Sequence, residues 1–201
     1  MMNIVLATNN PSKAEHIKSQ FAKLPIELRT LQECGITEEP VENGKTLEEN
    51  ALIKAKFAWE RTGKCSIADD TGIFIDALGG APGIHSGRFA GVGKTIEEGQ
   101  AFVIEKMKDV KEQDRSAVFR TVAVVFEADG THSVFRGEAY GRLLTEPATK
   151  PQPKMPYSAI FVPDGSFKTW AEMTDEERNK ISHRGKAFKQ VADFLKKEVI
   201  K

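Results

Sequence analysis

The sequence predicts an α/β protein with a mixed central sheet and a second lobe, and three observations favour this fold class. An apolar run over residues 3–8 is followed by helical periodicity, which is the strand–helix alternation typical of α/β proteins. A long β-rich stretch over residues 116–128 meets Asp129-Gly130, a strong hairpin signal, and returns over residues 131–139. Helical patterns then resume from Thr174. In such a protein the cleft between the lobes is the expected ligand site.

Helix boundaries are predicted from capping residues. The first helix follows Asn10 or Ser12 as N-cap and has Pro11 in its first turn. Thr46 and Glu49 have the spacing of a capping box, which gives Glu49 a structural role. Helices are expected over residues 46–61, 95–108 and 186–199, with a short one that opens at Thr174 and breaks at residues 182–185. Strands are expected over residues 26–31, 65–68, 73–78, 140–145 and 157–162.

Length and composition indicate one globular domain over residues 1–201. The 29 Lys and Arg residues balance the 29 Asp and Glu residues, and this zero net charge argues against nucleic acid or a membrane surface as a general partner. No apolar run is long enough to span a bilayer, and the N-terminus begins with a strand pattern in place of a signal segment. Cys34 and Cys65 lie far apart and in no CxxC pair, so we expect reduced thiols in a cytoplasmic protein.

A polar loop, Asn9–Lys13, joins the first strand to the first helix. The start of such a helix attracts phosphate through its amide groups and the positive end of its dipole. Lys13 lies in the first turn, where a positive charge is unfavourable for the dipole, so the sequence suggests an anion beside it. The alternative is a lysine that faces solvent. The glycines of a Walker A loop are absent.

Two adjacent carboxylates, Asp69 and Asp70, end the apolar stretch that begins at Cys65. Carboxylates at a strand end suit Mg²⁺ held over a phosphate, because magnesium takes one or two protein carboxylates and leaves its other positions to water and phosphate. The alternative is a turn in which the Asp side chains satisfy local amides. Successive side chains of a strand point to opposite faces, so both carboxylates reach one site only if the backbone turns, which Gly72 would make easy.

Several separated motifs, in matching order over nearly the whole chain, resemble the inosine triphosphate pyrophosphatase family, which hydrolyses non-canonical purine nucleoside triphosphates. The motifs are Ala7–Lys13, Glu42 with Gly44–Ala51, Ile67–Gly72, Leu78–Gly83, Ser86–Gly91 and Ile181–Gly185. The resemblance implies a long mixed central sheet flanked by helices, two lobes with the active-site cleft between them, and a homodimer. It also implies Mg²⁺-dependent attack of water on the α-phosphorus of ITP, dITP or XTP, which releases a nucleoside monophosphate and pyrophosphate.

The resemblance also assigns roles to individual residues. Asp70 would be the general base or a metal ligand, with Asp69 beside it, and Glu42 would complete the metal site. Lys13 would act both in catalysis and in binding the substrate. The other residues implied to bind substrate are Thr8, Asn9, Asn10, Lys54 and Arg88 on the phosphate side, Thr71, and His183 and Arg184 at the purine edge.

The chain departs from the family pattern in the segment implied to bind the base. Met155 stands where an aromatic residue is expected, and Ser158 replaces an aspartate, while Tyr157 lies between them. Arg178 stands where the family usually has a base-contacting lysine. We therefore assign Met155, Tyr157, Ser158 and Arg178 to substrate binding and expect phosphate chemistry, with two alternatives: the same chemistry on a different nucleotide, or nucleotide binding without turnover.

Overall fold

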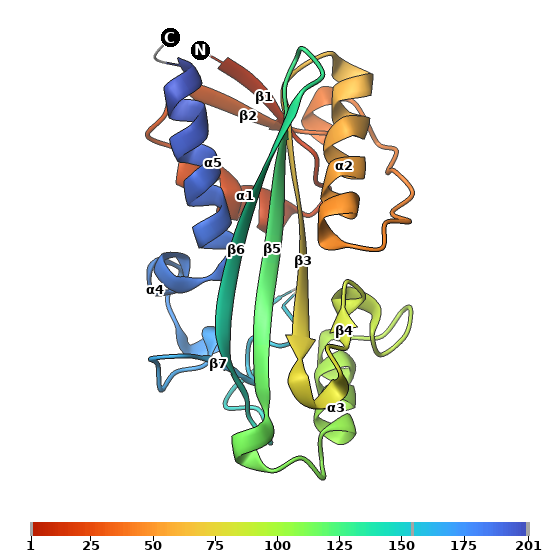
Figure 1. Cartoon of the computed structure of the whole chain (residues 1–201), viewed down its shortest axis with the longest axis vertical. Helices are drawn as coiled ribbons and strands as arrows, with labels where there is room; N and C mark the ends of the chain where they lie inside the picture. Colours follow the sequence, from red (N-terminus) through yellow and green to blue (C-terminus); the bar gives the residue numbers. More distant parts are fainter. Residues whose placement is uncertain (1, 154, 200–201) are drawn as a thin grey trace. The chain divides into compact units, whose positions relative to one another are not determined.

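The computed structural model describes residues 2–153 and 155–199 and shows an α/β fold with a seven-stranded sheet of order β2-β1-β3-β5-β6-β7, in which β4 pairs with β3 (Figure 1). β1 pairs parallel with β2 and β3, whereas β4 and β7 pair antiparallel with β3 and β6. The predicted mixed sheet with flanking helices is therefore confirmed. The strands are β1 (Met2–Leu6), β2 (Ile26–Thr30), β3 (Ser66–Ile75), β4 (Pro82–Gly83), β5 (Ser116–Phe126), β6 (His132–Leu143) and β7 (Phe161–Pro163). The α-helices are α1 (Pro11–Phe21), α2 (Leu47–Thr62), α3 (Ile96–Lys106), α4 (Asp175–Ile181) and α5 (His183–Val199).

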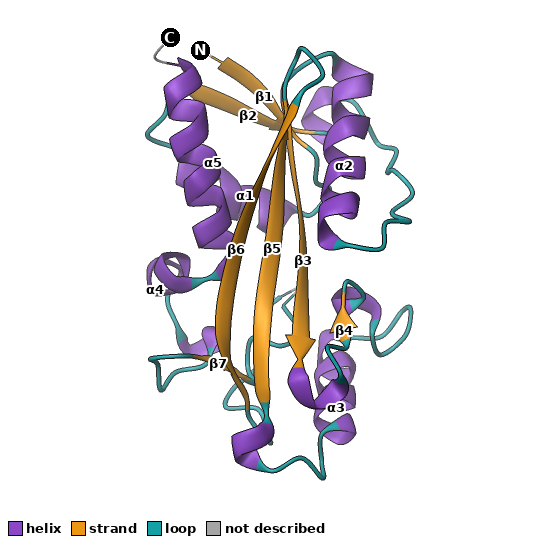
Figure 2. Ribbon diagram, in the orientation of Figure 1, coloured by secondary structure: helices purple, strands orange, loops and turns teal. Residues whose placement is uncertain are grey.

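The chain forms two compact units, each assembled from segments that are distant in the sequence. The first unit comprises the chain up to Asp70, Thr121–Gly137 and the chain from Lys186 onward. The second comprises Thr71–Arg120 and Glu138–Gly185. The three long strands β3, β5 and β6, drawn in orange in Figure 2, each run from one unit into the other. The chain also passes from the second unit back to the first inside α5, between Gly185 and Lys186.

The core of the first unit has two layers, one on each face of β1 and β3. α1 and α5 cover one face, where Ile4 and Ile67 pack with Phe21 of α1 and Phe188 of α5. α2 covers the other face, where small side chains such as Ala55 pack against neighbouring strand residues. Because side chains alternate along a strand, residues 4 and 67 face α1 while residues 5 and 68 face α2. This alternation continues into the carboxylates that follow.

The core of the second unit is aromatic and contains one buried guanidinium. Phe119 packs edge-on to Phe161, with ring centroids 4.9 Å apart, and contacts Trp170 at 4.6 Å. Arg115 is 1% exposed, and it donates to the backbone carbonyls of Leu143, Leu144, Met107 and Val110. Burial lowers the pKa of the Arg115 guanidinium, although Glu112 opposes that shift. Through these hydrogen bonds, Arg115 connects the backbone around residues 107–110 with the backbone at residues 143–144.

The alternative of a turn at Asp69–Gly72 is wrong, because β3 runs without interruption through these residues. Gly72 is required there for a different reason, which is the close approach of β4. A Cβ atom on Gly72 would lie 2.4 Å from the carbonyl oxygen of Gly83. Since the two carboxylates therefore lie on a continuous strand, they must point to opposite faces of the sheet.

Three predicted boundaries also need correction. Residues 140–145 form no separate strand, because β6 continues to Leu143. The strand expected over 157–162 is shorter, as β7, and residues 156–160 form turns stabilised by local hydrogen bonds such as Ser158 N to Met155 O, 3.1 Å. The helix break expected over residues 182–185 is confined to Ser182, because α4 ends at Ile181 and residues 183–185 already form the first turn of α5.

The junction of α4 and α5 requires a glycine. A Cβ atom on Gly185 would lie 2.0 Å from the carbonyl oxygen of Asn179. We expect Gly185→Ala to lower the free energy of unfolding by roughly 1–3 kcal/mol, because the backbone must shift to remove this overlap. Gly87→Ala is the matched control, since no atom lies within 4 Å of its added Cβ. Urea unfolding followed by circular dichroism would measure both, and equal stabilities would contradict the prediction.

The two cysteines form no disulfide with each other. Cys34 and Cys65 are free thiols, the first half-buried and the second buried. Burial raises the pKa of the Cys65 thiol to about 12, so this thiol is protonated and unreactive at neutral pH. Within residues 2–153 and 155–199, every helix is too short or too polar to cross a membrane.

Candidate active site

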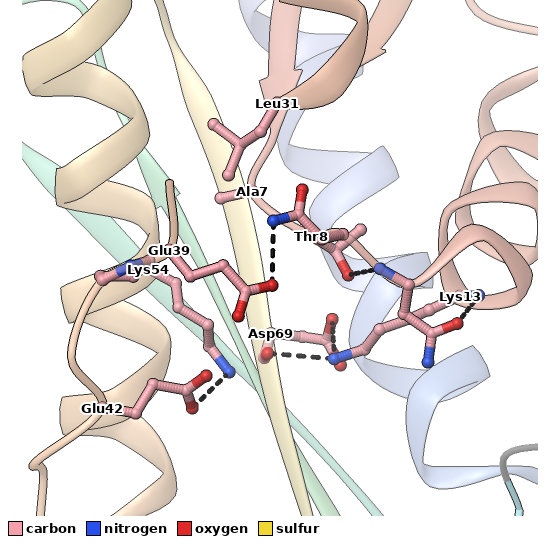
Figure 3. Close-up of a pocket in the computed structure, with 11 residues that line it drawn as sticks. Ala7, Thr8, Lys13, Leu31, Glu39, Glu42, Lys54 and Asp69 are labelled. Atoms are coloured by element: carbon pink, nitrogen blue, oxygen red, sulfur yellow. Dashed lines mark hydrogen bonds and ion pairs between the residues drawn. The ribbon is translucent and has the colours of Figure 1, made fainter. Parts of the chain in front are cut away.

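The first unit contains a pocket of about 190 Å³, shown in Figure 3. Its walls come from the loop after β1, the first turn of α1, the acidic loop before α2, and β3. The lining residues are Ala7, Thr8, Asn9, Asn10, Lys13, Leu31, Glu39, Pro40, Glu42, Lys54 and Asp69. The pocket thus brings together the predicted phosphate loop with Glu42 and Asp69, whereas Asp70 is not part of the lining and contacts the lining residue Lys54.

The phosphate loop is organised by its own side chains. Asn10 is the N-cap of α1, as predicted, and its Oδ1 accepts from the amide of Lys13 at 3.3 Å. Pro11 occupies the first turn, and the Thr8 hydroxyl accepts from the amide of Asn10 at 3.2 Å. Asn9 Nδ2 donates to Glu39 Oε1 at 2.9 Å, which connects this loop to the acidic loop (Figure 3). The positive end of α1 therefore opens onto the pocket.

The anion beside Lys13 is the carboxylate of Asp69. Lys13 Nζ lies 2.8 Å from Asp69 Oδ1 and 3.2 Å from the backbone oxygen of the same residue (Figure 3). The Asp69 side chain is 1% exposed and that of Lys13 is 16% exposed. The pair therefore explains how the first turn of α1 holds a positive charge that its dipole disfavours.

Lys54 connects the other two predicted carboxylates. Its Nζ lies 3.0 Å from Asp70 Oδ1 and 3.1 Å from Glu42 Oε2. Burial alone would lower the pKa of Lys54, but the charges of Asp70, Asp69 and Glu42 together raise it above the usual value. Lys54 consequently stays protonated at neutral pH and holds the two carboxylates toward one point.

Strand alternation explains why adjacent aspartates have different lysine partners. Ile67 and Asp69 point to the face covered by α1, which supplies Lys13. Asp70 follows the opposite alternation, toward α2, which supplies Lys54. The two carboxylates are therefore adjacent on β3 but point to opposite faces, and each forms an ion pair with a lysine from a different helix.

Asn50 and Glu39 were not among the predicted site residues. Asn50 is buried on α2, and its Nδ2 donates to Asp70 Oδ2 at 3.3 Å. Its spacing of four residues from Lys54 is a signal that was present in the sequence, because residues i and i+4 share a helix face. Glu39 lines the pocket and accepts from Asn9. No sequence signal distinguishes Glu39 from the other glutamates of its loop.

The residues predicted to contact the base lie in the second unit. His183 is 4% exposed, and its ring stacks on Phe119 at 4.9 Å and on Trp170 at 4.9 Å. Arg184 is half-buried in the first turn of α5. Thr71, half-buried on β3, is the first residue of the second unit. The base-reading roles of His183 and Arg184 stay predictions.

Hydrogen bonds connect residues 152 and 155–158, which include Met155 and Ser158, and Arg178 of α4 contacts Gln152. The Ser158 hydroxyl donates to Met155 O at 2.8 Å and accepts from the amide of Gln152 at 2.8 Å, and the side chain is buried. Arg178 donates to the Gln152 side chain and pairs with Asp175. In this structure Ser158 and Arg178 thus stabilise this arrangement.

Two further predicted binding residues of the second unit have protein partners. The Tyr157 hydroxyl donates to Ser86 O at 2.8 Å, and burial raises the pKa of Tyr157 above its usual range. Arg88 is exposed, and its Nη2 lies 3.3 Å from His85 Nδ1. Their roles in binding a substrate stay predictions.

Comparison with known proteins identifies the family. The model of the Ham1 family matches residues 4–194. The chain belongs to the Ham1 family. The motifs that led from the phosphate loop to the segment around His183 predicted this relationship, and the family assignment made from them is confirmed.

Individual Ham1 proteins agree with this assignment along the whole chain. The dITP/XTP pyrophosphatase of Thermoanaerobacter pseudethanolicus is 39% identical over 198 residues, with 98% of each chain covered. That of Bacillus subtilis is 37% identical over 196 residues, covering 97% of this chain and 98% of the relative. The solved structure of a HAM1 protein from Coxiella burnetii has a TM-score of 0.88 and 34% identity, and covers 98% of this chain and 100% of its own. These matches support both the fold and the family.

The pocket lining contains carboxylates, which are suitable ligands for a divalent cation. Among the described residues, no group of three or more His, Cys, Asp and Glu side chains could hold a metal ion by itself. Magnesium needs only one or two carboxylates when phosphate and water supply the rest, and Glu42 and Asp70 converge on the same Nζ atom. In the described lining, carboxylates outnumber ammonium groups, so an anionic phosphate would need an accompanying cation. The donor set therefore fits a divalent cation held together with a phosphate.

Proposed function

We propose that this Ham1 protein is a nucleoside triphosphate pyrophosphohydrolase that acts on dITP, XTP and ITP with Mg²⁺ and releases a nucleoside monophosphate and pyrophosphate. One observation carries the proposal. The N-terminus of α1 and two lysines, each held by one of two adjacent carboxylates, surround one pocket. The names of the relatives, dITP/XTP pyrophosphatases, support the same reaction.

The phosphate groups would bind at the start of α1. The positive end of the helix dipole favours phosphate there, and the capped loop of Thr8 and Asn10 is already ordered by hydrogen bonds. Lys13 supplies a charge on the same side of the pocket. Asp69 holds the Lys13 ammonium in place, so binding does not have to order a flexible side chain.

The hydrolytic chemistry would centre on Asp70. We assign its carboxylate the role of orienting the attacking water and accepting its proton. The water oxygen bonds to the α-phosphorus while the bond to the bridging oxygen breaks, and pyrophosphate leaves. Glu42 and Asp70 are the residues that would hold Mg²⁺, whose charge, when bound, neutralises the phosphate oxygens. Lys54 would contribute further positive charge beside the same phosphates.

A different nucleotide substrate is the second candidate. It is favoured by the hydrogen bonds around residues 152 and 155–158, in which Ser158 and Arg178 already have protein partners. If these side chains keep their protein partners, they cannot form hydrogen bonds with a base. Bases would then be distinguished mainly by shape, which gives weaker selectivity than hydrogen bonding. The chemistry at the phosphates would be unchanged.

The assembly and location are also proposals. The family resemblance supports a homodimer, which light scattering after size exclusion would test. The two free thiols, one of them buried, support a reducing compartment such as the cytoplasm.

Pyrophosphate release tests the function. We expect release from dITP, XTP and ITP in the presence of Mg²⁺, slower release from ATP and GTP, and loss of release when EDTA removes the metal. The same panel should include dUTP and other pyrimidine triphosphates. Efficient release from a triphosphate outside the first three would support the second candidate. If no triphosphate is hydrolysed while one raises the melting temperature, the protein binds nucleotides without turnover.

A further inference from the structure

Asn50 connects Asp70 to the loop that carries Glu42. It is 4% exposed and lies in the first turn of α2. Its Nδ2 donates to Asp70 Oδ2 at 3.3 Å, and its Oδ1 accepts from the amide of Gly44 at 2.9 Å. One buried amide side chain therefore contacts both the candidate catalytic carboxylate on β3 and the acidic loop.

The contact with the loop is close enough to require glycine at position 44. A Cβ atom there would lie 2.6 Å from Asn50 Oδ1 and 2.8 Å from Glu49 Cβ. Any other residue would push the loop away from α2. Because Glu42 is two residues before Gly44, the position of Glu42 depends on this approach.

α2 holds both oxygens of the Asp70 carboxylate. Lys54 contacts Oδ1 and Asn50 contacts Oδ2, and these two residues are four apart on the same helix face. The two contacts differ in charge. A triphosphate would attract the Lys54 ammonium, whereas the neutral amide of Asn50 has no such competing partner. The Asn50 hydrogen bond is thus the one that persists when substrate binds.

We propose that Asn50 is a positioning residue, which fixes the orientation of the Asp70 carboxylate and ties it to the Glu42 loop. The inference rests on the proposed function, because it assigns Asn50 to the same reaction. Carboxylates at a metal or catalytic site act only when their own hydrogen bonds hold them in the productive geometry. Asn50 supplies such a bond without adding charge to the site.

Ser66 provides a matched control for a purely structural role. Its hydroxyl is fully buried on β3 and donates to the backbone oxygen of Ala55 on α2 at 2.6 Å. This hydrogen bond joins the same two elements as the Asn50–Asp70 bond but contacts no carboxylate. Ser66→Ala should therefore lower stability to a similar degree and leave the chemistry unchanged.

The experiment compares Asn50→Ala, Asn50→Leu and Ser66→Ala with the unmodified protein. Leucine has nearly the shape of asparagine, so it keeps the packing if the alanine variant does not fold. We expect both Asn50 variants to lower kcat roughly 10- to 100-fold with little change in KM. The affinity for Mn²⁺ in the presence of saturating inorganic pyrophosphate, measured by electron paramagnetic resonance, should fall by a similar factor. Ser66→Ala should change neither quantity.

The outcomes separate this inference from the proposed function. If the Asn50 variants retain the kcat and the Mn²⁺ affinity of Ser66→Ala, Asn50 is only structural and the inference is wrong. If the unmodified protein hydrolyses no triphosphate, the proposed function fails. In that case the Mn²⁺ affinity decides on Asn50: its loss in both variants supports the positioning role, and its retention overturns that role.

Discussion

Asp70→Asn should lower kcat roughly 10²- to 10⁴-fold, because it removes the group that we assign to the attacking water. Asparagine has the size of aspartate, and its side-chain oxygen can still accept the hydrogen bond from Lys54, although its NH2 group cannot accept the one from Asn50. The fold and the pocket should therefore persist. It cannot accept a proton from water, and its neutral amide is a poorer ligand for Mg²⁺ than a carboxylate. The measurement is steady-state pyrophosphate release at saturating nucleotide.

Binding must be measured beside turnover. Calorimetric titration with the Mg²⁺ complex of the nucleotide should still detect binding to Asp70→Asn, because Lys13 and the start of α1 are untouched. Asp76→Asn is a suitable control, since this exposed carboxylate follows β3 outside the pocket. A kcat for Asp70→Asn equal to that of the control would refute the role of Asp70.

Lys13→Met should lower both stability and activity. The substitution removes the ammonium beside the Asp69 carboxylate, whose side chain is 1% exposed. Loss of one partner of a buried ion pair is strongly destabilising, and because Lys13 keeps some exposure we expect about 2–3 kcal/mol. Activity should fall as well, because the pocket loses a positive charge that faces the phosphates.

A second substitution separates the two effects. In Lys13→Met with Asp69→Asn the buried negative charge is gone, so most of the lost stability should return, while pyrophosphate release should stay low. Urea unfolding of the two single variants and the double variant gives the coupling energy. Recovery of activity in the double variant would show that Lys13 acts only by neutralising Asp69.

Local elements of this protein were predictable from the sequence alone. The caps at Asn10 and Thr46 and the hairpin at Asp129-Gly130 all appear in the structure. These features depend on residues within a few positions of one another, so local hydrogen bonds and backbone preferences determine them. The motifs and their order along the chain were also sufficient to predict the family.

Features that depend on distant residues were decided by the tertiary structure. Gly72 indicated a turn in the sequence, but its missing Cβ is needed for contact with Gly83 from another strand. His183 was expected at a helix break, whereas it begins α5 and its ring contacts the rings of both Phe119 and Trp170. Local preferences carry no information about which strand or ring will lie alongside a residue.

The candidate site shows the same division. The sequence indicated which carboxylates and lysines to consider, because Asp69, Asp70, Lys13 and Lys54 lie in recognisable motifs. Their pairing, and the part taken by Asn50, came only from the structure. Alternation along β3 turns adjacent aspartates toward different helices, and only the packing of α1 and α2 on opposite faces determines which cation each carboxylate meets.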